Sequence, residues 1–231
     1  MTRIVLLRHA HSVANAAGIL AGRTPAIALS KDGVRQSLEV ADRLTGVTFS
    51  AIRISPMERC AETVKPLLDR FSCAELKRIS IEKDEDLIEV DYGKWTGKKL
   101  ATLSRDKAWQ IVQDTPSAMY FPGGEGLLDV QARAMRALNR VAHSPGNDVK
   151  VLVSHGDVIK AILASVLGTH LDHFQKIVID PASLSILDFN GTNFRVLTMN
   201  NTATEVASFL AKSKKAKSLK ALVGGGSGRE N

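Results

Sequence analysis

The 231-residue sequence is poor in cysteine and has no long apolar run. Its two cysteines, Cys60 and Cys73, are separated by twelve residues and form no CxxC pair, which excludes a disulfide-rich scaffold and a cysteine zinc motif. No apolar run approaches the length of a membrane-spanning helix, and Met1–Leu7 is too short for the apolar core of a signal peptide. We therefore expect a reduced, cytoplasmic protein with no membrane partner.

Acidic residues are in the minority, with 24 Asp and Glu against 31 Lys and Arg, a formal net charge of +7. Residues 204–231 alone carry a net charge of +4, and they are rich in Lys, Gly and Ser. Such a composition buries too little apolar surface to fold, so we expect a solvated tail, disordered beyond about Phe209. Residues 1–203 are expected to form one domain, with residues 90–125 as a cap over the site. Because over half of the excess charge lies in the tail, the basic balance is weak evidence for nucleic-acid binding.

Apolar runs alternate with segments of helical periodicity along the chain, which predicts an α/β fold. The expected strands cover residues 4–7, 49–54, 77–81, 149–153, 177–179, 183–189 and 194–199. The expected helices cover residues 12–17, 32–44, 56–68, 100–112, 127–141 and 157–167. Asn190-Gly191 between the last two strands is a hairpin signal. The pattern predicts a three-layer sandwich with a mostly parallel central sheet, helices on both faces and an antiparallel hairpin at one edge.

Three of the buried runs end in basic residues. Arg8 and His9 follow the first run, Arg59 lies just after the second, and His155 follows the third. Ligands of open α/β sheets bind beyond the carboxyl ends of the strands, so these side chains should meet at one edge. Arginine matches phosphoryl oxygens with two parallel N–H groups, and a helix beginning near Asp157 adds free backbone N–H groups. The sequence therefore predicts a phosphate site.

The sequence has no GxxxxGKS/T loop and no GxGxxG after a strand, which argues against nucleotide chemistry on a P-loop. A neutral histidine beside arginines can instead attack phosphorus and form a covalent intermediate. That route needs an acid for the leaving group, and Glu89 is the best candidate, although a solvated glutamate is the alternative. His9 and His11, two residues apart, could bind zinc, but neither an HExxH motif nor a carboxylate cluster accompanies them. We expect no metal and no cofactor.

Several motifs, in order, resemble the histidine phosphatase superfamily of phosphoglycerate-mutase-like proteins. Leu6-Leu7-Arg8-His9-Ala10-His11-Ser12-Val13-Ala14-Asn15 is similar to the family's LxRHGExxxN, and Ser55–Thr63 to its SPLxRxxxT. Glu89–Gly97 resembles ExxxGxWxG, and Val153-Ser154-His155-Gly156 resembles VSHG. Gly22-Arg23 with Leu29–Gln36 resembles GR…LSxxGxxQ, and Pro122–Glu125 resembles PGGES.

The resemblance implies a role for each matching residue. It makes His9 the phosphorylated nucleophile and Glu89 the proton donor. It assigns Arg8, Arg59 and His155 to the phosphoryl group, with Asn15 as a further contact.

The chain departs from the family at three positions. Ala10 replaces a glycine, His11 replaces an acid, and Gly126 stands in place of the serine of PGGES. His11 is expected either as a donor in the pocket wall, which would place it among the phosphate-binding residues, or as a spectator facing solvent.

The segment before Pro122 bears on which member of the family this is. It is short and holds four bases, Lys98, Lys99, Arg105 and Lys107. In the resembled family, the cofactor-dependent mutases carry a larger, base-rich insertion at this place. The short segment therefore favours a phosphatase, a metal-independent phosphomonoesterase that releases inorganic phosphate from a small phosphorylated substrate. Four bases could still clamp a second phosphate, which leaves a phosphoglycerate-type mutase as the alternative, and a binder of phosphorylated ligands or nucleic acid as a third.

Aromatic residues in this segment could line the leaving-group side of the pocket or belong to the core; they are Trp95, Trp109, Tyr120 and Phe121. The expected hairpin at the edge of the sheet could be covered by the tail or by another subunit, so the sequence leaves the oligomeric state open.

Overall fold

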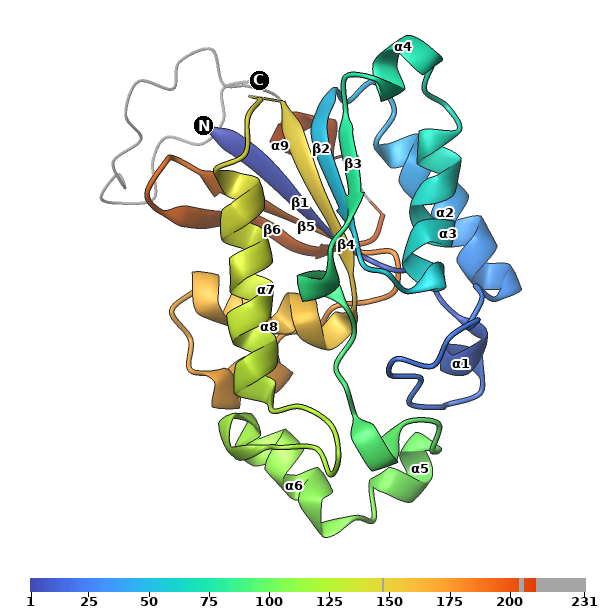
Figure 1. Ribbon diagram of the computed structural model, residues 1–231, viewed down its shortest axis with the longest axis vertical. Coiled ribbons are helices and arrows are strands. Elements are labelled where there is room, and N and C mark those ends of the chain that lie inside the picture. The colour runs from blue at the N-terminus through green and yellow to red at the C-terminus, as the bar shows by residue number, and fades with distance from the viewer. Residues whose placement is uncertain (147, 204–205, 211–231) are drawn as a thin grey trace.

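The computed structural model describes residues 1–146, 148–203 and 206–210, and within them a six-stranded sheet of order β3-β2-β4-β1-β5-β6 (Figure 1). The strands are β1 (Thr2–Arg8), β2 (Phe49–Ile54), β3 (Ser80–Lys83), β4 (Val149–Ser154), β5 (Leu184–Phe189) and β6 (Phe194–Asn201). The pairs β1–β4, β2–β4 and β2–β3 are parallel, whereas β5 runs antiparallel to both β1 and β6. The predicted α/β class, mostly parallel sheet and edge hairpin are confirmed.

Helices cover both faces of the sheet (Figure 1). They are α1 (Val13–Ala16), α2 (Lys31–Arg43), α3 (Glu58–Leu68), α4 (Cys73–Leu76), α5 (Leu100–Leu103), α6 (Lys107–Asp114), α7 (Leu127–Ala142), α8 (Gly156–Val166) and α9 (Ala207–Leu210). Alternate residues of a strand point to opposite faces, and β1 shows it directly. Ile4 and Leu6 pack in the core formed with α7 and α8, whereas Val5 and Leu7 pack in the core formed with α2 and α3. This two-sided burial is why the strand reads as an uninterrupted apolar run.

Three expected elements differ from the observed ones. The single helix expected over 100–112 is two helices, because Asp106 caps a new helix by accepting from the Ala108 backbone N–H (2.9 Å). The strand expected over 177–179 is wrong: this segment follows a 3-10 turn, Leu171–Lys176, and forms no strand. The strand expected at 77–81 begins only at Ser80, since residues 77–79 form the turn that follows α4.

The chain between β3 and α7 lies at the end of the molecule where β1 and β4 terminate (Figure 1). It contains 3-10 turns at Glu85–Leu87 and Gly93–Trp95, then α5, α6 and a further turn at Pro116–Ala118. The aromatic residues of this segment belong mainly to the core. Trp95 and Phe121 are buried against one another, whereas Tyr120 is exposed.

The tail predicted from residue 204 begins with a short helix, α9. Val206 and Leu210 are buried in the core shared with α2 and α3. The sequence predicts disorder beyond about Phe209, but Leu210 belongs to α9, and residues 211–231 lie outside the described residues.

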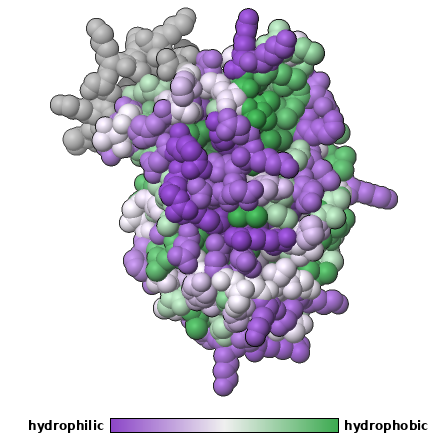
Figure 2. Space-filling model, in the orientation of Figure 1, coloured by the Kyte–Doolittle hydropathy of each residue, from purple (hydrophilic) through white to green (hydrophobic). Residues whose placement is uncertain are grey.

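The view in Figure 2 shows a mainly hydrophilic face interrupted by hydrophobic areas. Over the residues that the structure describes, no helix is long and apolar enough to cross a membrane.

Candidate active site

The ends of β1 and β4 bring two histidine rings together. Arg8 pairs with Ser154 in the parallel register, and the next backbone N–H, of His9, donates to the Ser154 carbonyl (2.9 Å). The following residues of the two strands, His9 and His155, have ring centroids 5.1 Å apart. Adjacent parallel strands in register therefore create a pair that lies 146 positions apart in the sequence.

His9 is held as a neutral imidazole with one nitrogen available. Its Nδ1 lies 2.8 Å from the Ala10 carbonyl oxygen, and because a carbonyl only accepts, Nδ1 carries the proton. Burial lowers the pKa of His9 well below its usual value, and the charges of Arg59 and Arg8 lower it further. The unprotonated Nε2 is the atom that could attack phosphorus.

Arg59 reaches the two histidines from the first turn of α3. It is 1% exposed, and its Nη2 donates to the Gly22 carbonyl (2.9 Å) and to His155 Nδ1 (3.1 Å). The other ring nitrogen of His155 lies 2.7 Å from Ser55 Oγ. Burial followed by the charge of Arg59 lowers the pKa of His155 well below its usual value, so this ring is neutral as well.

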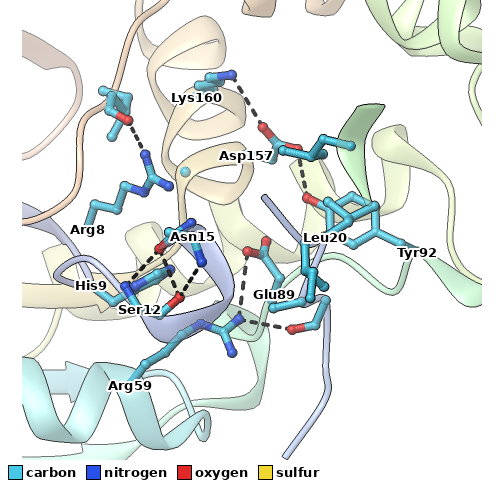
Figure 3. A pocket seen from close by; sticks show the side chains of 16 residues that line it. Arg8, His9, Ser12, Asn15, Leu20, Arg59, Glu89, Tyr92, Asp157 and Lys160 are labelled. Atoms are coloured by element: carbon cyan, nitrogen blue, oxygen red, sulfur yellow. Dashed lines mark hydrogen bonds and ion pairs between the residues drawn. The ribbon is translucent and has the colours of Figure 1, made fainter. Parts of the chain in front are cut away.

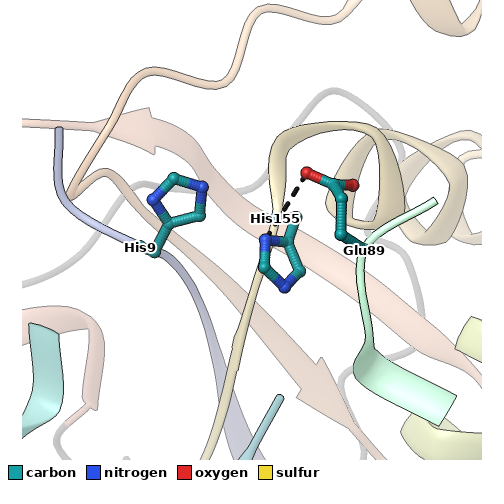
Figure 4. Close-up of side chains that lie close together, drawn as sticks. All are labelled: His9, Glu89 and His155. Carbon is teal, nitrogen blue, oxygen red and sulfur yellow. Dashed lines mark ion pairs between the residues drawn. The ribbon is translucent and has the colours of Figure 1, made fainter. Parts of the chain in front are cut away.

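Glu89 faces the same cluster from the loop that follows the Glu85–Leu87 turn (Figure 4). Its Oε2 lies 3.8 Å from Arg59 Nη2 and 3.5 Å from His155 Nδ1, while Oε1 accepts from the Val90 N–H (2.9 Å). Burial raises the pKa of Glu89 to about 7; Arg59 opposes the shift and the Asp157 carboxylate adds to it. A carboxyl with this pKa can give or take a proton near neutral pH.

These side chains open onto a cavity of about 210 Å³ (Figure 3). Arg8, His9, Asn15, Arg59 and Glu89 all line it, whereas His155 is fully buried behind them. Two buried nitrogens, Arg8 Nε and Arg59 Nη1, are among the few side-chain atoms of the described residues without a hydrogen-bond partner. An unpaired buried donor costs roughly 1–3 kcal/mol, so two of them beside one cavity indicate an anionic ligand.

Asn15 is oriented by the turn that connects β1 to α1. Its Oδ1 accepts from the Ser12 N–H (3.0 Å) and from Ser12 Oγ (2.9 Å). This capping arrangement fixes the amide at the cavity wall, and the protons of its nitrogen take no part in these bonds.

A buried ionic cluster that sequence reasoning missed holds the Glu89 loop. Arg133, from the middle of α7, donates to the carbonyls of Asp86 (2.9 Å), Ile88 (2.6 Å) and Glu89 (3.3 Å). Glu125 accepts from Arg133 Nη2 and from the Asp91 N–H, both at 2.8 Å.

Arg23 completes the cluster. It donates to the Glu89 carbonyl (2.9 Å) and to Glu125 Oε1 (2.8 Å). Glu125 and Arg23 stand within motifs that the sequence displays. Arg133 has no such signal, because an arginine on an amphipathic helix is ordinarily a solvated one.

His11 does not line this cavity. Its Nδ1 lies 2.8 Å from Ser30 Oγ, the N-cap of α2, and its side chain borders a separate cavity between α2 and the segment 180–182. The close packing of Gly33 explains the geometry, since a Cβ there would meet the His11 carbonyl at 1.9 Å. The structure therefore separates His11 from the phosphate-binding residues with which it was grouped.

A second of the three departures, Ala10, is tolerated without strain. It lies outside the positive φ region, and its backbone N–H donates to Thr63 Oγ1 (2.8 Å).

One trio of residues has the donor atoms for a metal ion. Ligand atoms of His9, Glu89 and His155 lie within 4.8 Å of one another (Figure 4). The Arg59 guanidinium nitrogen Nη2 lies 3.1 Å from His155 Nδ1 and 3.8 Å from Glu89 Oε2, and a second arginine charge, Arg8, lines the same cavity. Two fixed positive charges disfavour a dication and favour an anion at this place.

The fold and the site are typical of α/β proteins that bind phosphoryl groups with histidine and arginine side chains at the carboxyl edge of the sheet. The sequence profile of the histidine phosphatase superfamily (branch 1) matches residues 4–202. The chain belongs to this superfamily, as its motifs indicated.

Relatives and a solved structure agree with this assignment. The chain is 28% identical over 204 residues to a protein named phosphoserine phosphatase 1 of Hydrogenobacter thermophilus, covering 87% of this chain and 93% of the relative. It is 27% identical over 195 residues to the probable phosphoglycerate mutase GpmB of Proteus mirabilis, covering 83% and 87%. The structure of Bacillus stearothermophilus YhfR superposes with a TM-score of 0.80 at 25% identity, covering 88% of this chain and 98% of that one.

Proposed function

We propose that the protein is a metal-independent phosphomonoesterase that hydrolyses small phosphate monoesters through a phosphohistidine on His9. The observation that carries the proposal is the unprotonated Nε2 of His9 beside two arginines, Arg8 and Arg59, that each hold a buried nitrogen without a partner. The names of the two curated relatives, a phosphatase and a probable mutase of phosphorylated metabolites, support phosphate monoesters as substrates. The free thiols Cys60 and Cys73 support the cytoplasmic location that belongs to this proposal.

In the first step, His9 Nε2 forms a bond to phosphorus and the bond from phosphorus to the leaving oxygen breaks. Arg8 and Arg59 hold the phosphoryl oxygens, with the amide nitrogen of Asn15 as a third donor, and His155 keeps Arg59 in place. Glu89, in its carboxylic acid form, gives its proton to the leaving alkoxide.

In the second step, the Glu89 carboxylate takes a proton from water, and the water oxygen attacks phosphorus. The bond from phosphorus to Nε2 then breaks, inorganic phosphate leaves, and both side chains return to their initial states.

A phosphatase is favoured over a mutase by the surroundings of the cavity. Lys98, Lys99, Arg105 and Lys107, the four bases that could clamp a second phosphate, are exposed, and none of them lines the cavity. A mutase needs a second cationic site that retains a bisphosphorylated intermediate, and the lysine that does line the cavity, Lys160, has the Asp157 carboxylate 3.4 Å away. The test is whether the phosphoryl group of a phosphoglycerate moves to water or to the second hydroxyl.

Replacing His9 by Ala tests the proposed function. We expect His9→Ala to lower kcat on p-nitrophenyl phosphate by at least about 10³-fold, because removing a covalent nucleophile leaves only binding and electrostatic effects. The matched control is His173→Ala, at an exposed histidine outside the cavity, which should retain wild-type activity. EDTA should leave the wild-type rate unchanged. Full sensitivity to EDTA, or an active His9→Ala variant, would overturn the proposal.

A further inference from the structure

The cavity has a second polar wall that the phosphoryl chemistry leaves unused. Asp157 and Lys160, one turn apart near the start of α8, line the cavity together with Tyr92 (Figure 3). Figure 3 shows this group across the cavity from His9 and Arg59. A substrate whose phosphate lies against the arginines would therefore direct its alcohol portion toward Asp157 and Lys160.

Both charged groups are held in position but retain capacity for a ligand. Asp157 Oδ2 accepts from the Tyr92 hydroxyl (2.8 Å), whereas Oδ1 lies 3.4 Å from Lys160 Nζ, beyond ordinary hydrogen-bond length. Lys160 donates to Gln175 Oε1 (3.0 Å) and lies over the ring of Phe174. The two side chains are 23% and 19% exposed, so neither is sealed from a ligand.

A carboxylate in this wall does not serve phosphate binding. Asp157 repels a phosphate dianion, and it raises the pKa of Glu89. A lysine alone would suit a second anionic group, but the lysine and aspartate together suit a leaving group that carries both charges. At about 210 Å³ the cavity is smaller than the 300–1,000 Å³ typical of drug-sized ligands.

We propose that Asp157 and Lys160 form a subsite for a small zwitterionic leaving group. The substrate class is the phosphate ester of a hydroxy amino acid, with its ammonium on Asp157 Oδ1 and its carboxylate on Lys160 Nζ. This inference rests on the proposed function, because it places the phosphoryl group beside His9.

Four small phosphate esters test the subsite. O-phosphoserine carries both charges, O-phosphoethanolamine only the ammonium, 3-phosphoglycerate only the carboxylate, and ethyl phosphate neither. We expect kcat/KM for O-phosphoserine to exceed that for each singly charged ester by about tenfold or more, since a charge-assisted hydrogen bond contributes about that factor. Ethyl phosphate should be the poorest substrate of the four.

Two substitutions then assign each charge. Asp157→Asn removes the partner of the ammonium, so it should abolish the preference for O-phosphoserine over 3-phosphoglycerate. Lys160→Gln removes the partner of the carboxylate, so it should abolish the preference for O-phosphoserine over O-phosphoethanolamine. Lys98→Gln, at an exposed lysine outside the cavity, is the control that should keep both preferences. Equal kcat/KM for the four esters, a best substrate with one charge, or variants that slow all four equally would overturn the subsite.

Binding to the His9→Ala variant gives a second readout that needs no turnover. Calorimetry should show O-phosphoserine binding about tenfold more tightly than 3-phosphoglycerate, and equal affinities would overturn the inference. Hydrolysis of p-nitrophenyl phosphate that depends on His9, with no preference among the four esters, removes the subsite alone. If the wild-type protein also shows no His9-dependent hydrolysis of p-nitrophenyl phosphate, the proposed function is overturned together with the subsite.

Discussion

At the scale of single residues, Glu89 shows how the fold makes an acid–base group from an ordinary carboxylate. It is buried, as are His9, Arg59 and His155 around it. Desolvation alone would keep the carboxyl neutral, and Arg59 alone would keep it ionised. The balance of the two, a pKa of about 7, suits the roles that we propose for Glu89, as acid in one step and as base in the next.

The pH dependence of kcat tests this assignment. An alkyl phosphate has a poor leaving group, so the first step should limit kcat. That step needs protonated Glu89, so kcat should be high below about pH 7 and fall above it. Glu89→Gln should lower kcat by about 10²–10⁴-fold and remove this descending limb. A limb near pH 7 that persists in the variant would contradict the assignment.

The pH dependence of the free energy of unfolding gives an independent check of the raised pKa of Glu89, because the direction of the change is fixed. Because the folded pKa of Glu89 is raised, the folded state holds the proton that the unfolded state loses between about pH 4.5 and 7. The free energy of unfolding should therefore decrease as pH rises through this window, and the decrease should be smaller in Glu89→Gln. Urea titrations at several pH values measure the difference.

At the scale of elements, a helix rather than the loop itself fixes the position of Glu89, the proposed acid. The loop around Glu89 contributes few regular backbone hydrogen bonds, and Arg133 of α7 supplies donors for three of its carbonyls. Tight packing adds to this, since a Cβ on Gly124 would meet the Asp91 carbonyl at 2.1 Å. The loop therefore behaves as part of the rigid scaffold.

Arg133→Met separates positioning from simple stability. The variant removes the Arg133 donor of the Asp86 and Ile88 carbonyls and leaves Glu125 with only Arg23 and the Asp91 N–H, and we expect a loss of about 3–5 kcal/mol in the free energy of unfolding. It should also slow alkyl phosphates far more than 2,4-dinitrophenyl phosphate, whose leaving group needs no proton, because only the former depend on Glu89. Arg136→Met, at an exposed arginine on the same helix, is the control. Equal slowing of both substrate types would contradict a positioning role.

At the scale of the whole molecule, the order of the strands in the sheet determines which residues meet at the candidate active site. The parallel neighbours β1, β4 and β2 end at the same edge, which is why the residues after three separate apolar runs meet. Sequence reasoning could predict this for Arg8, His9, Arg59 and His155, because strand ends and family motifs mark them.

Other features were beyond the reach of the sequence. His11, two residues after the proposed nucleophile, faces a different cavity, and its backbone carbonyl packs against Gly33. Arg133 and the pairing of Asp157 with Tyr92 depend on contacts between distant elements. Such contacts leave no local periodicity in the sequence.

The central claim is that the phosphoryl group passes through His9, and trapping the intermediate tests it most directly. Wild-type protein is mixed with excess ³²P-labelled substrate, denatured within milliseconds in alkali, and digested for peptide mapping. The account predicts an acid-labile, alkali-stable label on the peptide that contains His9, and no label in His9→Ala. Turnover without any such label, or a label on another residue, would contradict it.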